Sequence, residues 1–338
     1  MNRLLVIFVS AALACGSLLA SIEGTVVNRT SGKPQARVTI TLVKPGAQGM
    51  QTLASTVSDG AGKFRFTNDQ PQGGPELLQA SYKSVNYNKL LTPNIPTTDV
   101  NVDVYEATSS ASVARVAQRM LLLEPSAGRI NVDETVIVQN EGNVTFTNHA
   151  LGAIRFYLPP AANDQVRVNA RGPQGMPLPC APEKAQEDDV FKVQFPIKPG
   201  ETEFQISYVL PVGSPFTFRD RVVNVTGMPS GPLRLVAPSG VRLAGKSIQQ
   251  VGTEPTTQAS IYNVTASRDF SVDISGTGAL HNDADASSAD TSDSPRPTEG
   301  QPQIYTHIRL LVALVFSILA VGLVILFRSS PLRLPYGK

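Results

Sequence analysis

Apolar and polar residues alternate in short runs over most of the chain between residues 21 and 276. In one such run, Val38, Ile40 and Leu42 stand at every second position, with Thr between them. A period of two places one face of a β-strand against a core and the other toward solvent. Gly and Pro, 26 residues of each, separate the runs, and Trp is absent. The sequence therefore predicts an all-β fold.

The runs between residues 21 and 107 form the first predicted domain, and three motifs mark it. The motifs are Gly24-Thr-Val26, Gly32-Lys-Pro34 followed by Val38-Thr-Ile40-Thr-Leu42, and Asp59-Gly-Ala-Gly62-Lys-Phe64-Arg-Phe66. Asp59, Gly60 and Gly62 suit a tight connection that needs positive φ angles. Phe64 and Phe66 are two residues apart, so we expect both side chains to point into the same core.

Together these motifs resemble the carboxypeptidase regulatory-like domain, and the resemblance covers residues 21–106 only. It implies a transthyretin-like seven-stranded sandwich, of the kind often grouped with carbohydrate-binding-like folds and attached to bacterial surface and envelope proteins. The zinc peptidase that gave the family its name needs a set of His and Glu ligands. This chain has only His149, His281 and His307, none of them in an HxxE or HExxH spacing. The resemblance therefore implies neither a metal site nor peptidase activity.

Residues 115–278 carry a second set of alternating runs, which predicts a larger β-sandwich of immunoglobulin-like kind. The Cys…Trp…Cys core of true immunoglobulin domains is absent. The segment FPIKPGETEFQISYVLP resembles the β-sandwich repeats of bacterial exported proteins, in which a Pro-Gly-Glu turn joins two long strands. The sequence leaves open whether this region is one domain or two.

Residues 1–20, MNRLLVIFVSAALACGSLLA, have the layout of a signal peptide. Arg3 gives a basic start, an apolar run follows, and small residues end the segment. Cleavage after Ala20 begins the mature chain where the strand pattern begins. The alternatives are a lipoprotein-type cleavage that leaves Cys15 lipidated, and an uncleaved anchor.

An apolar run without any charged residue extends from Leu310 to Phe327, and it predicts one C-terminal transmembrane helix over residues 308–328. Arg328, Arg333 and Lys338 follow the run. By the positive-inside rule these topology determinants make the tail, residues 329–338, cytoplasmic. The sequence thus predicts a single-pass protein of the cell membrane whose ectodomain is periplasmic or extracellular.

An acidic segment separates the second domain from this apolar run. Its residues HNDADASSADTSDSPRPTEGQPQ include almost no apolar side chain larger than Ala. Such a segment cannot bury enough surface to offset the entropy of ordering it, so residues 279–304 are predicted to be a disordered stalk. The aspartates lack the DxDxDG order of a calcium loop.

Charge and motifs argue against several classes of function. The formal net charge of +2, from 29 basic and 27 acidic residues, provides no field that would attract nucleic acid. A GxSxG nucleophile elbow and a GxGxxG between strand and helix are absent from the sequence. His149 is the histidine that a Ser-His-Asp triad could use, but a solvated turn histidine is the favoured interpretation. We therefore predict no catalytic residue, cofactor or metal.

Cys180 is the remaining candidate for reactivity, and four acids, Glu183, Glu187, Asp188 and Asp189, follow it closely. Neighbouring acids raise the pKa of a thiol and make it a poorer nucleophile, so an inert cysteine is expected. The acidic cluster could pair with a cation, but a hydrated loop explains it equally well.

For ligand binding, the candidates are Tyr82, Tyr87 and Tyr105 of the first domain, whose rings could stack on sugars if exposed. The first hypothesis is a non-enzymatic, membrane-anchored envelope protein whose β-sandwiches form an interaction or scaffolding module for an envelope protein partner. The alternative is binding of a carbohydrate or cell-wall polymer, a polysaccharide, through the regulatory-like domain. An unrecognised hydrolase is a distant third.

Overall fold

The computed structural model describes residues 22–46, 49–66, 76–92, 97–173, 175–211 and 216–280. These residues form strands joined by turns, with two short 3-10 helices, η2 (Ala111–Val113) and η3 (Pro160–Ala162). The prediction of an all-β fold is confirmed. Within the described residues no helix is long and apolar enough to cross a membrane. The predicted signal peptide, transmembrane helix and tail, and the stalk beyond its first two residues, lie outside them.

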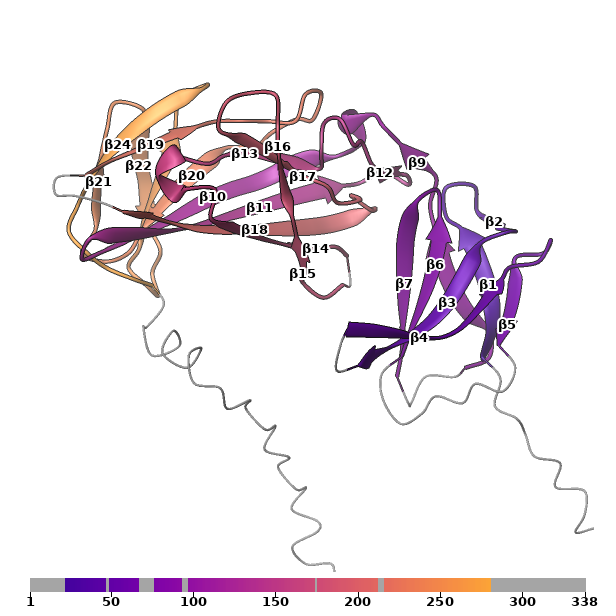
Figure 1. Ribbon diagram of the computed structural model, residues 1–338. Coiled ribbons are helices and arrows are strands. Elements are labelled where there is room, and N and C mark those ends of the chain that lie inside the picture. The colour runs from indigo at the N-terminus through magenta and orange to yellow at the C-terminus, as the bar shows by residue number, and fades with distance from the viewer. Residues whose placement is uncertain are drawn as a thin grey trace, which may run out of the picture. The chain divides into compact units, whose positions relative to one another are not determined.

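The first sandwich consists of two sheets that share one core (Figure 1). One sheet has a central strand, β1 (Ile22–Asn28), whose partners are β2 (Lys33–Pro34), β5 (Lys63–Phe66) and, in parallel, β8 (Val100–Val104). The other sheet is antiparallel, in the order β4 (Gly49–Val57), β3 (Thr39–Gly46), β6 (Glu76–Tyr82) and β7 (Val85–Leu91). Between the sheets lie the fully buried side chains of Ile22, Ile40, Leu42 and Leu78.

The tight connection predicted around Asp59 is confirmed. One carboxylate oxygen, Oδ1 of Asp59, accepts hydrogen bonds from the backbone N–H groups of Ala61, at 2.9 Å, and Lys63, at 2.8 Å. Gly62 adopts a φ of +73°, and a Cβ there would lie 2.8–2.9 Å from its neighbours. Phe64 and Phe66 are each 3% exposed and point into the same core, as expected.

Gly24 lies where β1 and β8 pair with little room for a side chain. A Cβ on Gly24 would lie 1.9 Å from the carbonyl oxygen of Val100, its partner in the parallel pair. It would also lie 2.9 Å from the ring of Phe64, which packs on the other side. Glycine at this position is therefore a steric requirement of the sheet.

Replacement of Gly24 by Ala is expected to lower the free energy of unfolding by about 1–3 kcal/mol, because the added methyl group overpacks this contact. Gly60→Ala is the control, since a Cβ at Gly60 meets nothing within 4 Å. Urea denaturation of the two variants and the parent measures the difference. Equal stability of both variants would contradict the close approach of β1 and β8.

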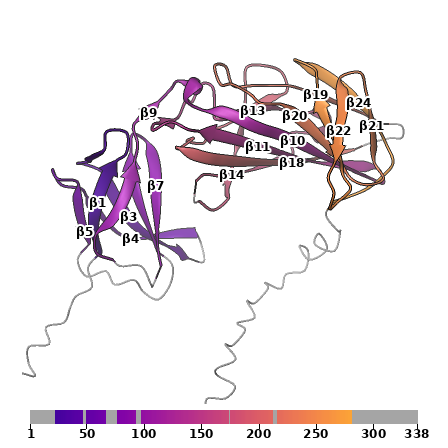
Figure 2. The ribbon, with the colours of Figure 1, turned by 180° about the vertical axis from the view of Figure 1, so that it is seen from behind.

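The second sandwich is built on an eight-stranded sheet (Figures 1 and 2). Its strand order is β15 (Leu178–Cys180), β14 (Val166–Arg171), β18 (Gly200–Pro211), β11 (Arg129–Asn140), β10 (Arg115–Ser126), β20 (Leu233–Ala237), β23 (Ser260–Val264) and β22 (Ile248–Thr253). β10, β11 and β18 pair along nearly their whole lengths. They form the centre of the sheet.

Two three-stranded sheets cover the inner face of this large sheet, because their buried residues belong to the same core. One has the order β13 (Ile154–Tyr157), β17 (Val190–Val193) and β16 (Pro182–Lys184). The other has the order β19 (Phe216–Arg221), β24 (Asp269–Ser275) and β21 (Arg242–Ala244). Phe146, Phe156, Phe204 and Phe218 are among the largest fully buried side chains of this core.

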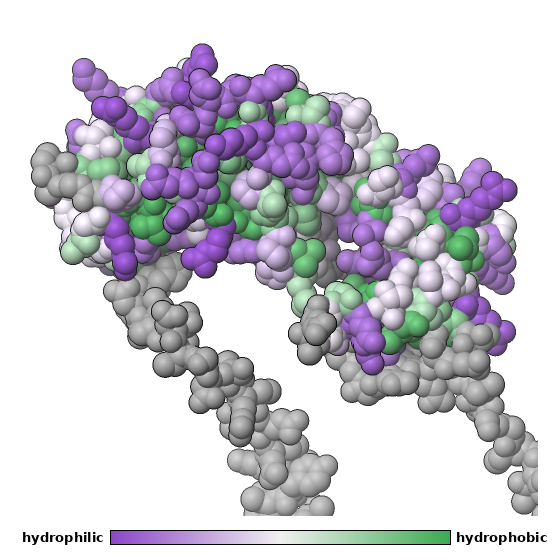
Figure 3. Space-filling view, viewed as in Figure 1, coloured by the Kyte–Doolittle hydropathy of each residue, from purple (hydrophilic) through white to green (hydrophobic). Residues whose placement is uncertain are grey.

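The two sandwiches have separate hydrophobic cores, and a short parallel pair connects their sequences. β9 (Ala107–Thr108) follows the first sandwich and pairs with β12 (Thr145–Phe146) of the second. In Figure 3, hydrophilic residues are prominent on the visible face of the second sandwich. The outward positions of its strands thus carry many polar side chains.

Candidate functional site

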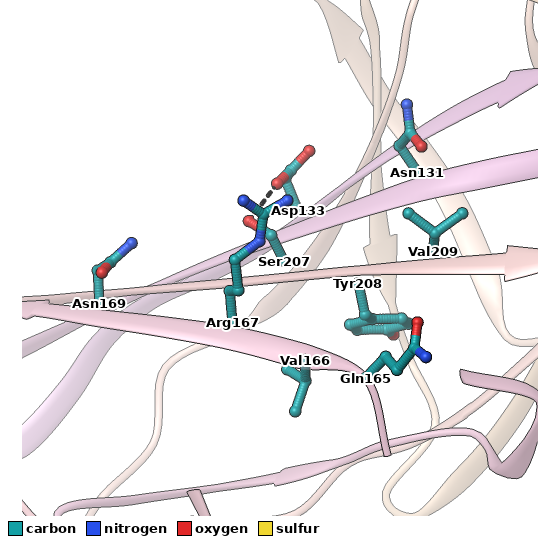
Figure 4. A pocket seen from close by; sticks show the side chains of 9 residues that line it. All are labelled: Asn131, Asp133, Gln165, Val166, Arg167, Asn169, Ser207, Tyr208 and Val209. Atoms are coloured by element: carbon teal, nitrogen blue, oxygen red, sulfur yellow. Dashed lines mark hydrogen bonds between the residues drawn. The ribbon is translucent and has the colours of Figure 1, made fainter. Parts of the chain in front are cut away.

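The candidate site is a polar hollow of about 690 Å³ over strands β14, β18 and β11 (Figure 4). It is lined by Asn131, Asp133, Gln165, Val166, Arg167, Asn169, Ser207, Tyr208 and Val209. Most of these side chains are polar, and they come from three neighbouring strands and the residue before β14. We call this region the polar hollow.

The alternation of the strands brings most of the polar side chains of the three strands to one face. In β11, Ile130 and Val132 point into the core, so Asn131 and Asp133 point outward. The register aligns Arg167, Ser207 and Asp133 as one row across β14, β18 and β11. Figure 4 shows these three side chains on the same side of the sheet, with the ring of Tyr208 on the opposite side.

The charges in the polar hollow are only partly satisfied. Ser207 Oγ donates a hydrogen bond to Asp133 Oδ1 at 2.5 Å. Arg167 is exposed, and among the described residues it has no carboxylate within ion-pair distance. On the same strand and face, by contrast, Arg171 donates to Glu203, and this contact lowers the pKa of Glu203. Arg167 therefore keeps its guanidinium donors for solvent or a ligand.

Carboxamide, guanidinium, hydroxyl and carboxylate groups in one hollow can donate and accept several hydrogen bonds. That combination suits a ligand rich in hydroxyl or amide groups. Among the described residues no group of three or more His, Cys, Asp and Glu could hold a metal ion.

The three tyrosines predicted from the sequence lie close together, but not on an open face. Tyr87 is 3% exposed, and its hydroxyl group lies 3.1 Å from the carbonyl oxygen of Tyr105 and 2.9 Å from Thr145 Oγ1. The rings of Tyr87 and Tyr105 are 5.9 Å apart. Tyr87 therefore cannot offer a free ring for stacking on a sugar, which corrects the expectation of an exposed aromatic at this position.

Tyr82 is engaged in a polar network of the same sandwich. Its hydroxyl group donates to Glu106 Oε1 at 2.5 Å, and Asn28 donates to the same oxygen at 2.8 Å. Burial, and then the hydrogen bond to Glu106, raise the pKa of Tyr82 to about 12. The same bond lowers the pKa of Glu106. Tyr82 thus acts as a hydrogen-bond donor within the fold.

Lys198, which no sequence motif marks, packs against this tyrosine cluster. Its Nζ lies 5.1 Å from the centre of the Tyr87 ring and donates to the carbonyl oxygen of Asn86 at 2.5 Å. Burial lowers the pKa of Lys198 to about 8. Lys198 precedes β18, far from Tyr87 in sequence, so no local motif could have revealed the contact.

Cys180 lies in the edge strand β15, half-buried beside Val168 of β14. Burial raises the pKa of the Cys180 thiol, which agrees with the predicted direction. Contrary to the expectation, burial and not the acids that follow Cys180 causes this shift. One of these acids, Glu187, accepts two hydrogen bonds from Arg155. His149 is exposed, and its backbone carbonyl accepts from Lys192 at 2.7 Å.

A cluster of buried charges lies in the core of the second sandwich. Arg119 of β10 donates from Nε to Glu134 of β11 and from Nη1 to the carbonyl oxygen of Val223, the latter at 2.6 Å. Asp220 of β19, 6% exposed, adds a second carboxyl group. Burial lowers the pKa of Arg119, but the charges of Glu134 and Asp220 outweigh burial and raise it.

One arginine cannot neutralise two carboxylates in this core. Burial, and then the charge of Glu134, raise the pKa of Asp220 from 3.8 to about 7. The folded protein therefore holds a proton on Asp220 that the unfolded chain releases above about pH 4. The stability that this proton contributes is present at low pH and is lost as the pH rises through 7.

We expect the free energy of unfolding to fall by about 2–3 kcal/mol between pH 5 and pH 8 through Asp220. Asp220→Asn removes the titration and should flatten this dependence. The exposed strand residue Asp273 provides the control Asp273→Asn, which should keep the parent's slope. Urea denaturation at each pH measures the slopes, and a parent stability that rises over this window would contradict the assignment.

Comparison with known proteins gives little further guidance. No family model and no curated protein matches this chain. Among solved structures, the M1 zinc metallopeptidase from Deinococcus radiodurans matches 47% of this chain and 42% of its own, at 14% identity and a TM-score of 0.26. A two-domain M1 zinc metallopeptidase mutant bound to L-tryptophan matches 48% and 43%, at 13% identity and a TM-score of 0.25. The chain thus spans about two fifths of these structures, and TM-scores this low support no conclusion about fold or activity.

Proposed function

We propose that this protein is a non-enzymatic binding protein of the bacterial envelope, held in the membrane by its C-terminal segment. In this proposal the first domain is a transthyretin-like sandwich, the second is immunoglobulin-like, and the polar hollow is the contact surface for an envelope protein. The observation that carries the proposal is the polar hollow itself, an outward sheet face whose donors and acceptors are only partly used by the residues that the structure describes.

The sheet provides a firm base for such a contact. β18 is hydrogen-bonded to β14 on one side and to β11 on the other. Its inward side chains, including Phe204 and Ile206, are fully buried. Side chains on a strand that is paired on both sides are held in place, so little order has to be imposed when a partner binds.

Simultaneous replacement of Arg167 and Asn169 by Ala is expected to weaken partner binding at least about tenfold, because charge-assisted hydrogen bonds contribute about 1.5–3 kcal/mol each. Arg171→Ala is the matched control, since Arg171 lies on the same strand and face but is paired with Glu203. The measurement is cross-linking of the full chain to envelope proteins in cells. Equal loss in both variants, or in neither, would contradict the assignment of the polar hollow.

Binding of a polysaccharide is the second candidate, and the chemistry of the polar hollow favours it over the tyrosine cluster. Asn131, Gln165 and Asn169 carry amide groups, which donate and accept hydrogen bonds as sugar hydroxyls require. Tyr87, by contrast, is buried. Retention of the full chain on peptidoglycan or polysaccharide beads, lost in the same double variant, would support this candidate. A defined protein cross-link without retention supports the first.

The proposed anchor predicts a defined orientation. In intact spheroplasts an added protease should remove the ectodomain and leave the tail after Arg328 protected, because positive residues stay on the cytoplasmic side. Immunoblotting with tags at the two ends of the mature chain measures this. Protection of the ectodomain would overturn the proposed orientation.

A further inference from the structure

The strand β4 of the first sandwich lies at the open edge of its sheet. Within the described residues it pairs with β3 only. Its nine residues, GMQTLASTV, include no charged residue and no Pro. Natural proteins usually protect an edge strand of this length with charges, Pro or a covering segment, because its free N–H and C=O groups can pair with another strand. β4 therefore has neither a charged residue nor Pro to protect its open edge.

A β-bulge gives β4 an unusual arrangement of side chains. The register with β3 pairs Leu42 with Ala54 and Val43 with Thr52, so Leu53 is an extra residue. Leu53 and Ala54 both pack against the core. Because the bulge shifts the alternation by one residue, Met50 and Val57 lie on the same outer face although an odd number of positions separates them. They are 54% and 55% exposed.

We propose that two copies of this protein pair through β4, antiparallel and edge to edge, around a two-fold axis between Leu53 and Ala54. In this register Met50 lies opposite Val57 of the partner subunit, and each of these exposed apolar side chains covers the other. Opposite residues in an antiparallel pair share one face of the sheet. Because of the bulge, every opposite pair in this register lies on one face. Thr52 lies opposite Ser55 of the partner subunit on the outer face, and Gln51 lies opposite Thr56 of the partner subunit on the other face.

The charges around β4 also favour a second copy. A two-fold axis places β4 beside β4 of the partner subunit. Such pairing is unfavourable for a charged strand, because like charges come close together. β4 has no charged residue, so this penalty is absent. The opposite edge of the same sheet, β7, is different: it carries Lys89, and the carbonyl group of Asn86 accepts from Lys198. The two copies therefore meet through β4 rather than β7.

The test uses the full chain in detergent micelles, with sedimentation measured over a concentration series. The contact is one strand wide, so we expect a dimer that dissociates at roughly micromolar concentration. Thr52→Lys places a charge from each copy close to the axis. These like charges repel, so the dissociation constant of the dimer should rise at least about tenfold. Asn88→Lys, an exposed position on β7, is the matched control and should leave the dimer unchanged. Circular dichroism verifies that both variants fold.

A second measurement tests the register. Thr52→Cys combined with Ser55→Cys, in a Cys180→Ser background, should give a disulfide-linked dimer on oxidation, whereas Thr52→Cys alone should not. A chain that stays monomeric at all concentrations overturns the proposal. A dimer that Thr52→Lys does not weaken also overturns it, because such a dimer must form through another surface.

Discussion

Burial of every second residue in β11 and β18 is the constraint on which the second sandwich depends. Ile130, Val132, Phe204 and Ile206 have no exposed surface, and transfer of such side chains from water is the dominant favourable term in folding. Because the side-chain period of a strand is two, this burial also decides what faces outward. A slip of one residue in β11 would bring Val132 to the surface and Asn131 into the core, so the same packing that stabilises the sheet fixes the polar hollow.

A cluster of charged side chains interrupts this apolar pattern. Glu134 occupies an inward position between Val132 and Val136, and Arg119 and Asp220 lie with it. Buried charges are costly unless they are paired and hydrogen-bonded, and here Arg119 is bonded to both Glu134 and the carbonyl group of Val223. Burial, and then the charge of Glu134, raise the pKa of Asp220 to about 7, so its carboxyl group retains a proton near neutral pH.

Local patterns predicted local structure well. The alternation around Ile40 predicted a strand, and the Asp59 motif predicted both the turn and the inward orientation of Phe64 and Phe66. Contacts between distant segments were out of reach, because no period or spacing relates Tyr87 to Lys198. An aromatic residue in a strand looks the same in sequence whether its ring is exposed or covered by a later segment.

The sequence contained a sign of the buried charges, but only the structure shows what it means. Glu134 interrupts the row of Ile and Val residues in RINVDETVIVQN, which marks an acid at a core position. The pairing of β10 with β11 brings Arg119 to Glu134, and the packing of a second sheet, which contains β19, adds Asp220. The polar hollow has the same origin, since Asn131, Asp133 and Arg167 are ordinary outward residues until three strands are aligned.

The parallel pair of β1 and β8 has a consequence for the order in which the chain is made. β1 precedes the other strands of that sandwich and can pair with β5 early, but Gly24 meets its parallel partner Val100 only after every other strand of the sandwich has emerged. Long-range pairing of this kind makes folding slow and leaves apolar side chains such as Ile22 and Val26 uncovered in the meantime. A nascent chain of this protein must therefore be kept from aggregating until its first hundred residues or so are available.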